Sequence, residues 1–184
     1  MWGAAPGFVY SRYGNPTVAM FERRIALLES SWNAPEPSFE TLAGDFDGKR
    51  FNSPNDVAVR SDGTLWFTDP PWGLRGKHEI PGHWVFKLDP KSGKVQAVVK
   101  DLAMPNGIVF SPDETRIYIA DTGGHKRHPD PKFHKYPDSI RCYAVSADGN
   151  LGKKLFQIDE GSDGIAVDVK GNGFDLGGGL RRCA

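Results

Sequence analysis

One motif recurs three times along the chain at a spacing of about 50 residues, and this repeat limits the folds open to the chain. Each copy opens with Asn or Asp before a short apolar alternation, and the opening residues are Asn55, Asn106 and Asp163. The spacings are 106 − 55 = 51 and 163 − 106 = 57 residues. A repeat of roughly 50 residues is the length of one propeller blade.

Within each repeat, apolar and polar residues alternate between clusters of Gly, Pro and Asp, which is the pattern of β-hairpins. The expected strands lie near 55–60, 64–69, 83–89 and 94–99, then near 106–110, 115–120, 139–146 and 153–158. Four antiparallel strands per repeat make one propeller blade. The third repeat starts at Asp163, and its pattern fails after Asn172. We therefore predict an all-β fold with two complete and two partial blades of a β-propeller.

The first 38 residues do not share this pattern. Apolar residues at 18, 21, 25 and 28 follow a possible N-cap at Thr17 and predict a short helix, after which residues 30–38 have the composition of a linker. Three parts are therefore expected: an N-terminal segment at 1–38, a propeller fragment at 39–172 and an irregular tail at 173–184.

Composition narrows the classes of partner. The 184 residues include 23 basic and 23 acidic side chains, whereas nucleic acids and anionic membranes attract a basic excess, so we expect neither as a partner. No apolar run approaches the ~20 residues of a membrane span, and the start lacks the features of a signal peptide, so a cytoplasmic location is expected. Cys142 and Cys183 are too few for a disulfide framework or a Cys-x-x-Cys metal site.

The three repeated opening residues are the main candidates for a functional site. The first strand of each propeller blade lines the central channel, so Asn55, Asn106 and Asp163 are expected to converge there. Amide and carboxylate oxygens gathered in a channel suit a hard divalent cation such as Ca²⁺ or Mg²⁺. The structural alternative for each residue alone is a turn, in which Asn and Asp side chains bond their own backbone. Turn or blade-edge positions are expected for Asp56, Asp62, Asp113 and Asp168.

The sequence also leads to predictions for two loops and for a group of aromatic residues. Residues 123–136 hold three of the five histidines, but Pro129 and Pro131 prevent a helical histidine face, so a solvated loop is favoured over a zinc site. Residues 69–74 are a candidate for shaping a substrate entrance. The core between blades is expected to include Trp66, Phe67, Trp84 and Phe86.

Four segments, which begin at Arg50, Trp66, Met104 and Ser162, resemble the regucalcin/gluconolactonase/luciferin-regenerating-enzyme family. They read RFNSPNDV, WFTDPPWGL, MPNGI and SDGIAV, and the resemblance covers about residues 39–172. The family is a six-bladed propeller with one divalent metal in its channel, and many members hydrolyse sugar lactones. The resemblance implies a metal-dependent hydrolase of the gluconolactonase type, which opens a sugar lactone to the aldonic acid.

The resemblance also implies a function for single residues. Asn106 and Asp163 match the metal-ligand Asn and Asp of the family, and Asp163 matches the proposed general base. Asn55 matches a substrate-side Asn near the metal, and Arg50 stands where some members place a substrate-contacting Arg. Calcium is the favoured cation, with zinc, magnesium or manganese as alternatives.

The sequence also departs from the family. The first metal ligand of the family is a Glu in a Glu-Gly-Pro motif on the N-terminal blade, which has no counterpart here, and the last blades are missing. Other interpretations therefore stay open: a truncated or chimeric propeller that binds calcium or a ligand without turnover, or an inactive chain. Open blade edges favour aggregation, and two copies that pair these edges would self-associate.

Residues 8–29 resemble a different family, the pyridoxal-phosphate enzymes of Cys/Met metabolism. In that family the counterparts of Tyr10 and Arg12 contact the cofactor phosphate of a neighbouring subunit. The body of that fold and its Schiff-base lysine are missing, and covalent aldehyde chemistry needs that lysine. We therefore expect no activity from this segment.

Overall fold

The computed structural model describes residues 41–124, 126, 128–168, 173–175 and 182–183. The chain divides into two compact units between Leu42 and Ala43. The helix predicted near the N-terminus and the segment that resembles pyridoxal-phosphate enzymes both lie outside the described residues. Within the described ranges the chain is almost entirely β, with one short 3-10 helix, η1 (Pro131–Phe133). In these same ranges, no helix is long and apolar enough to cross a membrane.

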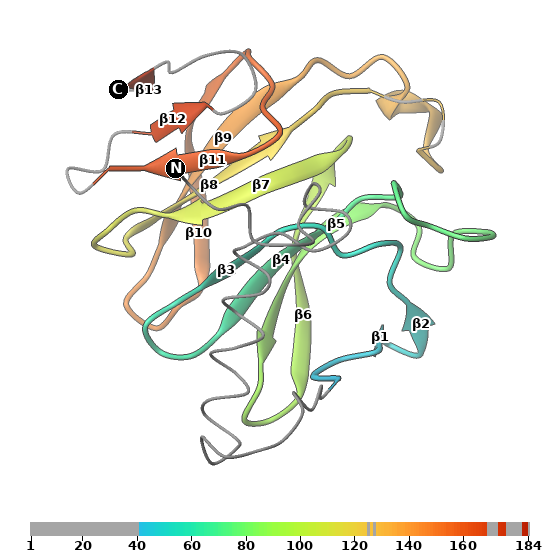
Figure 1. Ribbon diagram of the computed structural model, residues 1–184, viewed down its shortest axis with the longest axis horizontal. Helices are drawn as coiled ribbons and strands as arrows, with labels where there is room; N and C mark the ends of the chain where they lie inside the picture. Colours follow the sequence, from blue (N-terminus) through green and yellow to red (C-terminus); the bar gives the residue numbers. More distant parts are fainter. Residues whose placement is uncertain (1–40, 125, 127, 169–172, 176–181, 184) are drawn as a thin grey trace, which may run out of the picture. The chain divides into compact units, whose positions relative to one another are not determined.

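Two four-stranded antiparallel sheets form the body of the structure (Figure 1), and each has its strands side by side in sequence order. The first sheet contains β3 (Val57–Val59), β4 (Leu65–Asp69), β5 (His83–Asp89) and β6 (Lys94–Leu102). The second sheet contains β7 (Pro105–Phe110), β8 (Arg116–Asp121), β9 (Ser139–Val145) and β10 (Leu151–Ile158). All eight strands overlap the predicted ranges, which confirms the strand content of the two complete repeats. Four antiparallel strands in sequence order are the arrangement of a propeller blade.

A third sheet and a hairpin complete the described part, and both differ from expectation. The tail expected to be irregular contains β12 (Gly173–Asp175), which pairs antiparallel with β11 (Ile165–Val167), and β13 (Arg182–Cys183), which pairs antiparallel with β12. Backbone pairing, of β12 with β11 and of β13 with β12, forms these strands even though the sequence there lacks an apolar run. A hairpin of β1 (Asp45–Phe46) and β2 (Lys49–Arg50) was not predicted. Its turn residues Asp47 and Gly48 have φ of 54° and 71°, and an Asp-Gly pair is the signal for such a turn.

The first and second sheets share one apolar core. Because neighbouring residues of a strand point to opposite faces, Trp66 and Phe67 belong to different sides of the first sheet. Trp66 is fully buried and packs edge-on against Phe110 of the second sheet, with ring centroids 5.6 Å apart, so its predicted place between blades is confirmed. Phe67 lies on the other face, together with Trp84 and Phe86. This second aromatic cluster includes Phe51 and Phe46 of the segment that precedes the first sheet.

The turns at one end of the two sheets also touch. The Glu114 carboxylate accepts hydrogen bonds from the backbone N–H and the hydroxyl of Ser61, at 2.8 and 2.6 Å. Arg60 lies 3.6 Å from the same carboxylate and donates to the carbonyl of Ala147 at 3.1 Å. Lys87 donates to the carbonyl of Gly149 at 2.6 Å. Polar contacts therefore join the first and second sheets at the end opposite to the starts of β3 and β7.

Candidate functional site

The structure brings the three repeated opening residues together. The side-chain Nδ2 of Asn55 donates to Oδ1 of Asn106 at 2.8 Å, and Nδ2 of Asn106 donates to Oδ1 of Asp163 at 2.8 Å. Asn106 is buried, Asn55 is half-buried and Asp163 is exposed. The result is a hydrogen-bonded row across three successive sheets, which we call the Asn-Asn-Asp row. The expected convergence of these side chains is therefore observed.

Gly107 explains how the second and third sheets approach closely enough for this row. A Cβ atom at Gly107 would lie 3.0 Å from the carbonyl oxygen of Asp163, from Cα of Gly164 and from the backbone nitrogen of Ile165. Few real Cβ contacts are that short, so a side chain at this position would require the neighbouring backbone to shift by a few tenths of an ångström. The Gly of the Pro-Asn-Gly motif therefore serves close backbone approach beside Asn106.

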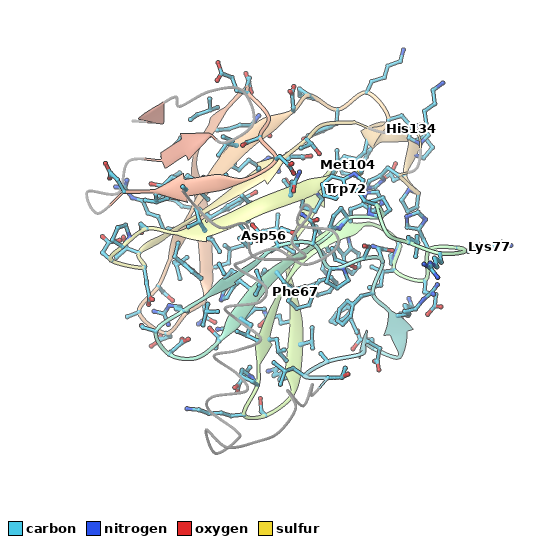
Figure 2. All side chains as sticks on the ribbon, viewed as in Figure 1. Asp56, Phe67, Trp72, Lys77, Met104 and His134 are labelled. Atoms are coloured by element: carbon cyan, nitrogen blue, oxygen red, sulfur yellow. The ribbon has the colours of Figure 1, made fainter. Side chains whose placement is uncertain are left out.

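The first sheet holds the backbone that follows the Asn106 side chain. The hydroxyl of Thr68 donates to the carbonyl of Asn106 at 2.8 Å and accepts from the backbone N–H of Asp56 at 3.2 Å. The carboxylate of Asp56 accepts from the backbone N–H of Ile108 at 3.0 Å. Figure 2 shows Asp56 between β7 and the strands of the first sheet. Asp56 was expected in a turn or at a blade edge, and it instead connects two sheets.

Burial is the main cause that raises the pKa of Asp56 above its ordinary value. The negative charge of Asp163 raises it further, while hydrogen bonds from the backbone of Ile108 and Val57 act in the opposite direction. The charge of Asp163 therefore acts on Asp56 although the two residues precede strands of different sheets. Asp62 and Asp113, by contrast, accept hydrogen bonds within their own turns, as expected from the sequence.

Asp69, the last residue of β4, holds the segment that leads to Asn55. Its two carboxylate oxygens accept the backbone N–H groups of Asn52 at 2.9 Å and Ser53 at 2.7 Å. Asp69 is fully buried, and this burial raises its pKa to about 6 although the hydrogen bonds favour the charged form. The hydroxyl of Ser53 also accepts the N–H of Gly73, so the 69–74 loop is fastened beside this segment.

Asp121, the last residue of β8, repeats this arrangement in the second sheet. Its carboxylate accepts the backbone N–H groups of Ala103 at 2.8 Å and Met104 at 2.7 Å, two residues before Asn106. Asp121 is also fully buried, and burial raises its pKa. The spacing 121 − 69 = 52 matches the sequence repeat, so a search for the repeat at the ends of the second strands would have found both residues.

Arg50, expected to contact substrate, binds a neighbouring loop. Its guanidinium Nη2 donates to the carbonyl of Arg75 at 3.2 Å and to the carbonyl of Lys77 at 3.5 Å. Its backbone N–H donates to the carboxylate of Glu79, and the two side chains form an ion pair at 3.5 Å. Figure 2 shows Lys77 at the tip of this loop. These contacts direct the Arg50 side chain to the loop between β4 and β5.

Histidines join the two long loops that follow β4 and β8. Nδ1 of His83 donates to the carbonyl of Ala103 at 2.7 Å, since a carbonyl can only accept, and its Nε2 lies 3.1 Å from Nε2 of His78. The rings of His83 and His128 are 4.3 Å apart. His128 and Phe133 are buried, whereas Lys126 and Lys135 of the same loop are exposed, so the described part of the 123–136 loop is solvated only in part. Burial lowers the pKa of His78 and of His128.

The donors in the Asn-Asn-Asp row fit a hard divalent cation. Asn106 and Asp163 offer amide and carboxylate oxygens, which Ca²⁺ and Mg²⁺ prefer, whereas zinc favours His and Cys. Within the part of the chain that the structure describes, no group of three or more His, Cys, Asp or Glu residues is placed to hold a metal ion. Any cation at the row would therefore depend on amide oxygens and on water for much of its coordination.

Comparisons with known proteins agree with this architecture. A gluconolactonase of Zymomonas mobilis is 32% identical over 151 residues, which are 72% of this chain and 38% of the relative. A lactonohydrolase of Aspergillus oryzae, oryL, is 30% identical over 102 residues, 53% of this chain and 23% of that protein. The structure of a gluconolactonase from Xanthomonas campestris superposes with a TM-score of 0.61 at 32% identity. It is matched over 81% of this chain and 52% of its own length.

A luciferin-regenerating enzyme shares the fold, with a TM-score of 0.51 at 19% identity over 78% of this chain and 46% of that structure. The chain thus spans about half the length of the solved relatives and less than two fifths of the curated ones. The model of one protein family, described as the SMP-30/gluconolactonase/LRE-like region, matches residues 3–174. The chain therefore belongs to the SMP-30/gluconolactonase/LRE-like family.

Proposed function

We propose that the chain is the site-bearing part of a metal-dependent lactone hydrolase of the gluconolactonase type, which opens a sugar lactone to the aldonic acid. The observation that carries this proposal is the Asn-Asn-Asp row, in which two hydrogen bonds of 2.8 Å connect three successive sheets. Relatives named gluconolactonase and lactonohydrolase support the substrate class. We also propose that the three sheets are blades of a six-bladed ring, completed by further chain or by a second copy.

The three residues of the row supply different chemistry. Asp163 is exposed at the end of the row, and its carboxylate accepts the proton of the water that attacks the lactone carbonyl. Asn55, half-buried at the other end, holds the sugar hydroxyls of the substrate by hydrogen bonds. Asn106 and Asp163 would hold the divalent cation, calcium by preference, which when bound polarises the lactone carbonyl and stabilises the developing oxyanion.

The position of Asp163 is set by the row. Its Oδ1 accepts the amide hydrogen of Asn106, which itself is oriented by the amide of Asn55. A general base must lie within hydrogen-bond reach of the proton that it takes, so this orientation decides whether attack is productive. Proton transfer by a positioned side chain contributes about 10²- to 10⁴-fold to rate, which sets the loss expected when Asp163 is neutralised.

The test is hydrolysis of glucono-1,5-lactone by the purified chain, followed as release of acid above the spontaneous rate. Asp163→Asn should abolish the calcium-dependent rate, and EDTA should do the same to the unsubstituted chain. Asp113→Asn is the matched control, because Asp113 accepts hydrogen bonds only from its own turn among the contacts observed, and it should leave the rate unchanged. A chain that folds and binds calcium but gives no turnover would refute the proposal in favour of a binding protein.

A further inference from the structure

We propose that Thr68 is a positioning residue for this reaction: its hydroxyl fixes the backbone of Asn106 and thereby sets the distances within the Asn-Asn-Asp row. This inference rests on the proposed function for its kinetic consequences, but its structural part stands separately. Asn55 and Asp163 bond the side chain of Asn106, whereas the Thr68 hydroxyl bonds its backbone. It acts through the carbonyl of Asn106, to which it donates at 2.8 Å.

The hydroxyl of Thr68 is part of a relay between two sheets. It accepts the backbone N–H of Asp56 at 3.2 Å while it donates to Asn106, so one oxygen connects the start of β3 to the start of β7. Asp56 then accepts the N–H of Ile108, two residues beyond Asn106. The backbone around Asn106 is thus held at its carbonyl and at the next-but-one amide, both times from the first sheet.

Thr68 is unusual among the threonines with hydroxyl contacts in the described ranges. Thr64 and Thr115 bond carboxylates of their own turns, and Thr122 bonds the carbonyl of Met104, its pairing neighbour in the second sheet. Thr68 alone in this group reaches from one sheet to another. It is also fully buried, so water cannot replace its hydroxyl when that group is removed.

The geometry of the row explains why this hydroxyl affects function. Asn106 makes hydrogen bonds of 2.8 Å in two directions, to Asn55 and to Asp163. Gly107 packs directly against the backbone of the third sheet, so the Asn106 backbone has little room to shift toward Asp163. Loss of the Thr68 contact therefore displaces the amide of Asn106 away from one partner or the other, and the amide then orients Asp163 less well.

The experiment compares two nearly isosteric variants. Thr68→Val keeps the methyl group and loses the hydroxyl, whereas Thr68→Ser keeps the hydroxyl and loses the methyl group. Thr64→Val is the control, because the Thr64 hydroxyl bonds Asp62 in the turn at the other end of the first sheet. The first measurement is the ¹⁵N–¹H spectrum of side-chain amides, in which Asn55 and Asn106 each give a pair of signals. The second is kcat and KM for glucono-1,5-lactone.

Thr68→Val should shift the Asn106 and Asn55 side-chain amide signals and speed their exchange with water, while Thr68→Ser and Thr64→Val leave them in place. It should also lower kcat about 10-fold with a smaller change in KM, in keeping with one lost hydrogen bond, and Thr68→Ser should restore kcat. Unchanged amide signals in folded Thr68→Val would overturn the inference. If the unsubstituted chain has no lactonase activity, the proposed function fails, and the amide signals alone decide about Thr68.

Discussion

Raising the pH from 4 to 7 is expected to weaken the folded chain through Asp69, in contrast to the usual behaviour of a paired carboxylate. Burial raises the pKa of Asp69 from 3.8 to about 6. The folded chain therefore binds the Asp69 proton more tightly than the unfolded chain does. The resulting stabilisation is fully present below pH 3.8 and is lost as the pH rises through 6.

The size of the effect follows from the two pKa values. A difference of about 2 pKa units corresponds to about 3 kcal/mol, of which about 2 kcal/mol falls between pH 4 and pH 7. Other groups titrate in the same window, and the lowered pKa values of His78 and His128 act in the opposite direction. A single pH curve therefore cannot isolate Asp69, and the prediction concerns the difference between the chain and its Asp69→Asn variant.

The assay is urea unfolding at a series of pH values between 4 and 7 for both chains. The free energy of unfolding of the unsubstituted chain, relative to Asp69→Asn, should fall by about 2 kcal/mol across this range. Asp113→Asn is the control, because hydrogen bonds from Ser111 and Thr115 lower the pKa of Asp113 below its ordinary value of 3.8. This group therefore titrates below the range of the assay, and the difference between the chain and Asp113→Asn should stay nearly constant from pH 4 to pH 7. A difference between the chain and Asp69→Asn that is constant, or that rises with pH, would refute the reasoning from burial.

Two further predictions concern packing near the row. Gly107→Ala should shift the backbone of Asp163 by a few tenths of an ångström and lengthen the Asn106–Asp163 hydrogen bond. The side-chain amide signals of Asn106 should therefore move and lactone hydrolysis should fall. Activity and amide signals equal to those of the unsubstituted chain would contradict the close approach. Phe110→Ala should lower the free energy of unfolding by about 3–5 kcal/mol, because it leaves a cavity in the core beside Trp66. Urea unfolding measures this loss, and a loss below about 1 kcal/mol would contradict the shared core.

Much of the fold could be predicted because its signals are local. Apolar alternation and turn residues predicted all eight strands of the two complete repeats. The register of the repeat also predicted that Asn55, Asn106 and Asp163 lie close together. The predictions missed a strand whose sequence has no apolar alternation and which forms by pairing with a neighbouring strand. The strand Gly173–Asp175 forms by backbone pairing with β11, and no apolar run announces it.

The residues that support the site were harder to find. Thr68 and Asp121 end or nearly end a strand, where a polar residue has an ordinary structural interpretation. The repeat spacing marks Asp121, but the sequence does not say which segments either residue contacts. Their importance lies in hydrogen bonds to backbone groups 17 to 38 positions away in the chain. For Arg50, the sequence suggested a contact with substrate by resemblance. It did not indicate that the guanidinium donates hydrogen bonds to the carbonyls of Arg75 and Lys77.

The polar contacts between the turns of the first and second sheets affect how the chain unfolds. Glu114 and Arg60 join the first and second sheets at one end, and Asp56 joins them at the other, with Trp66 and Phe110 between. If either sheet unfolded, polar groups of the other sheet would lose their hydrogen-bond partners. The two sheets should therefore open together as one cooperative unit in hydrogen exchange. The sequence repeats once per sheet, but we expect the pair of first and second sheets to be the smallest unit that opens.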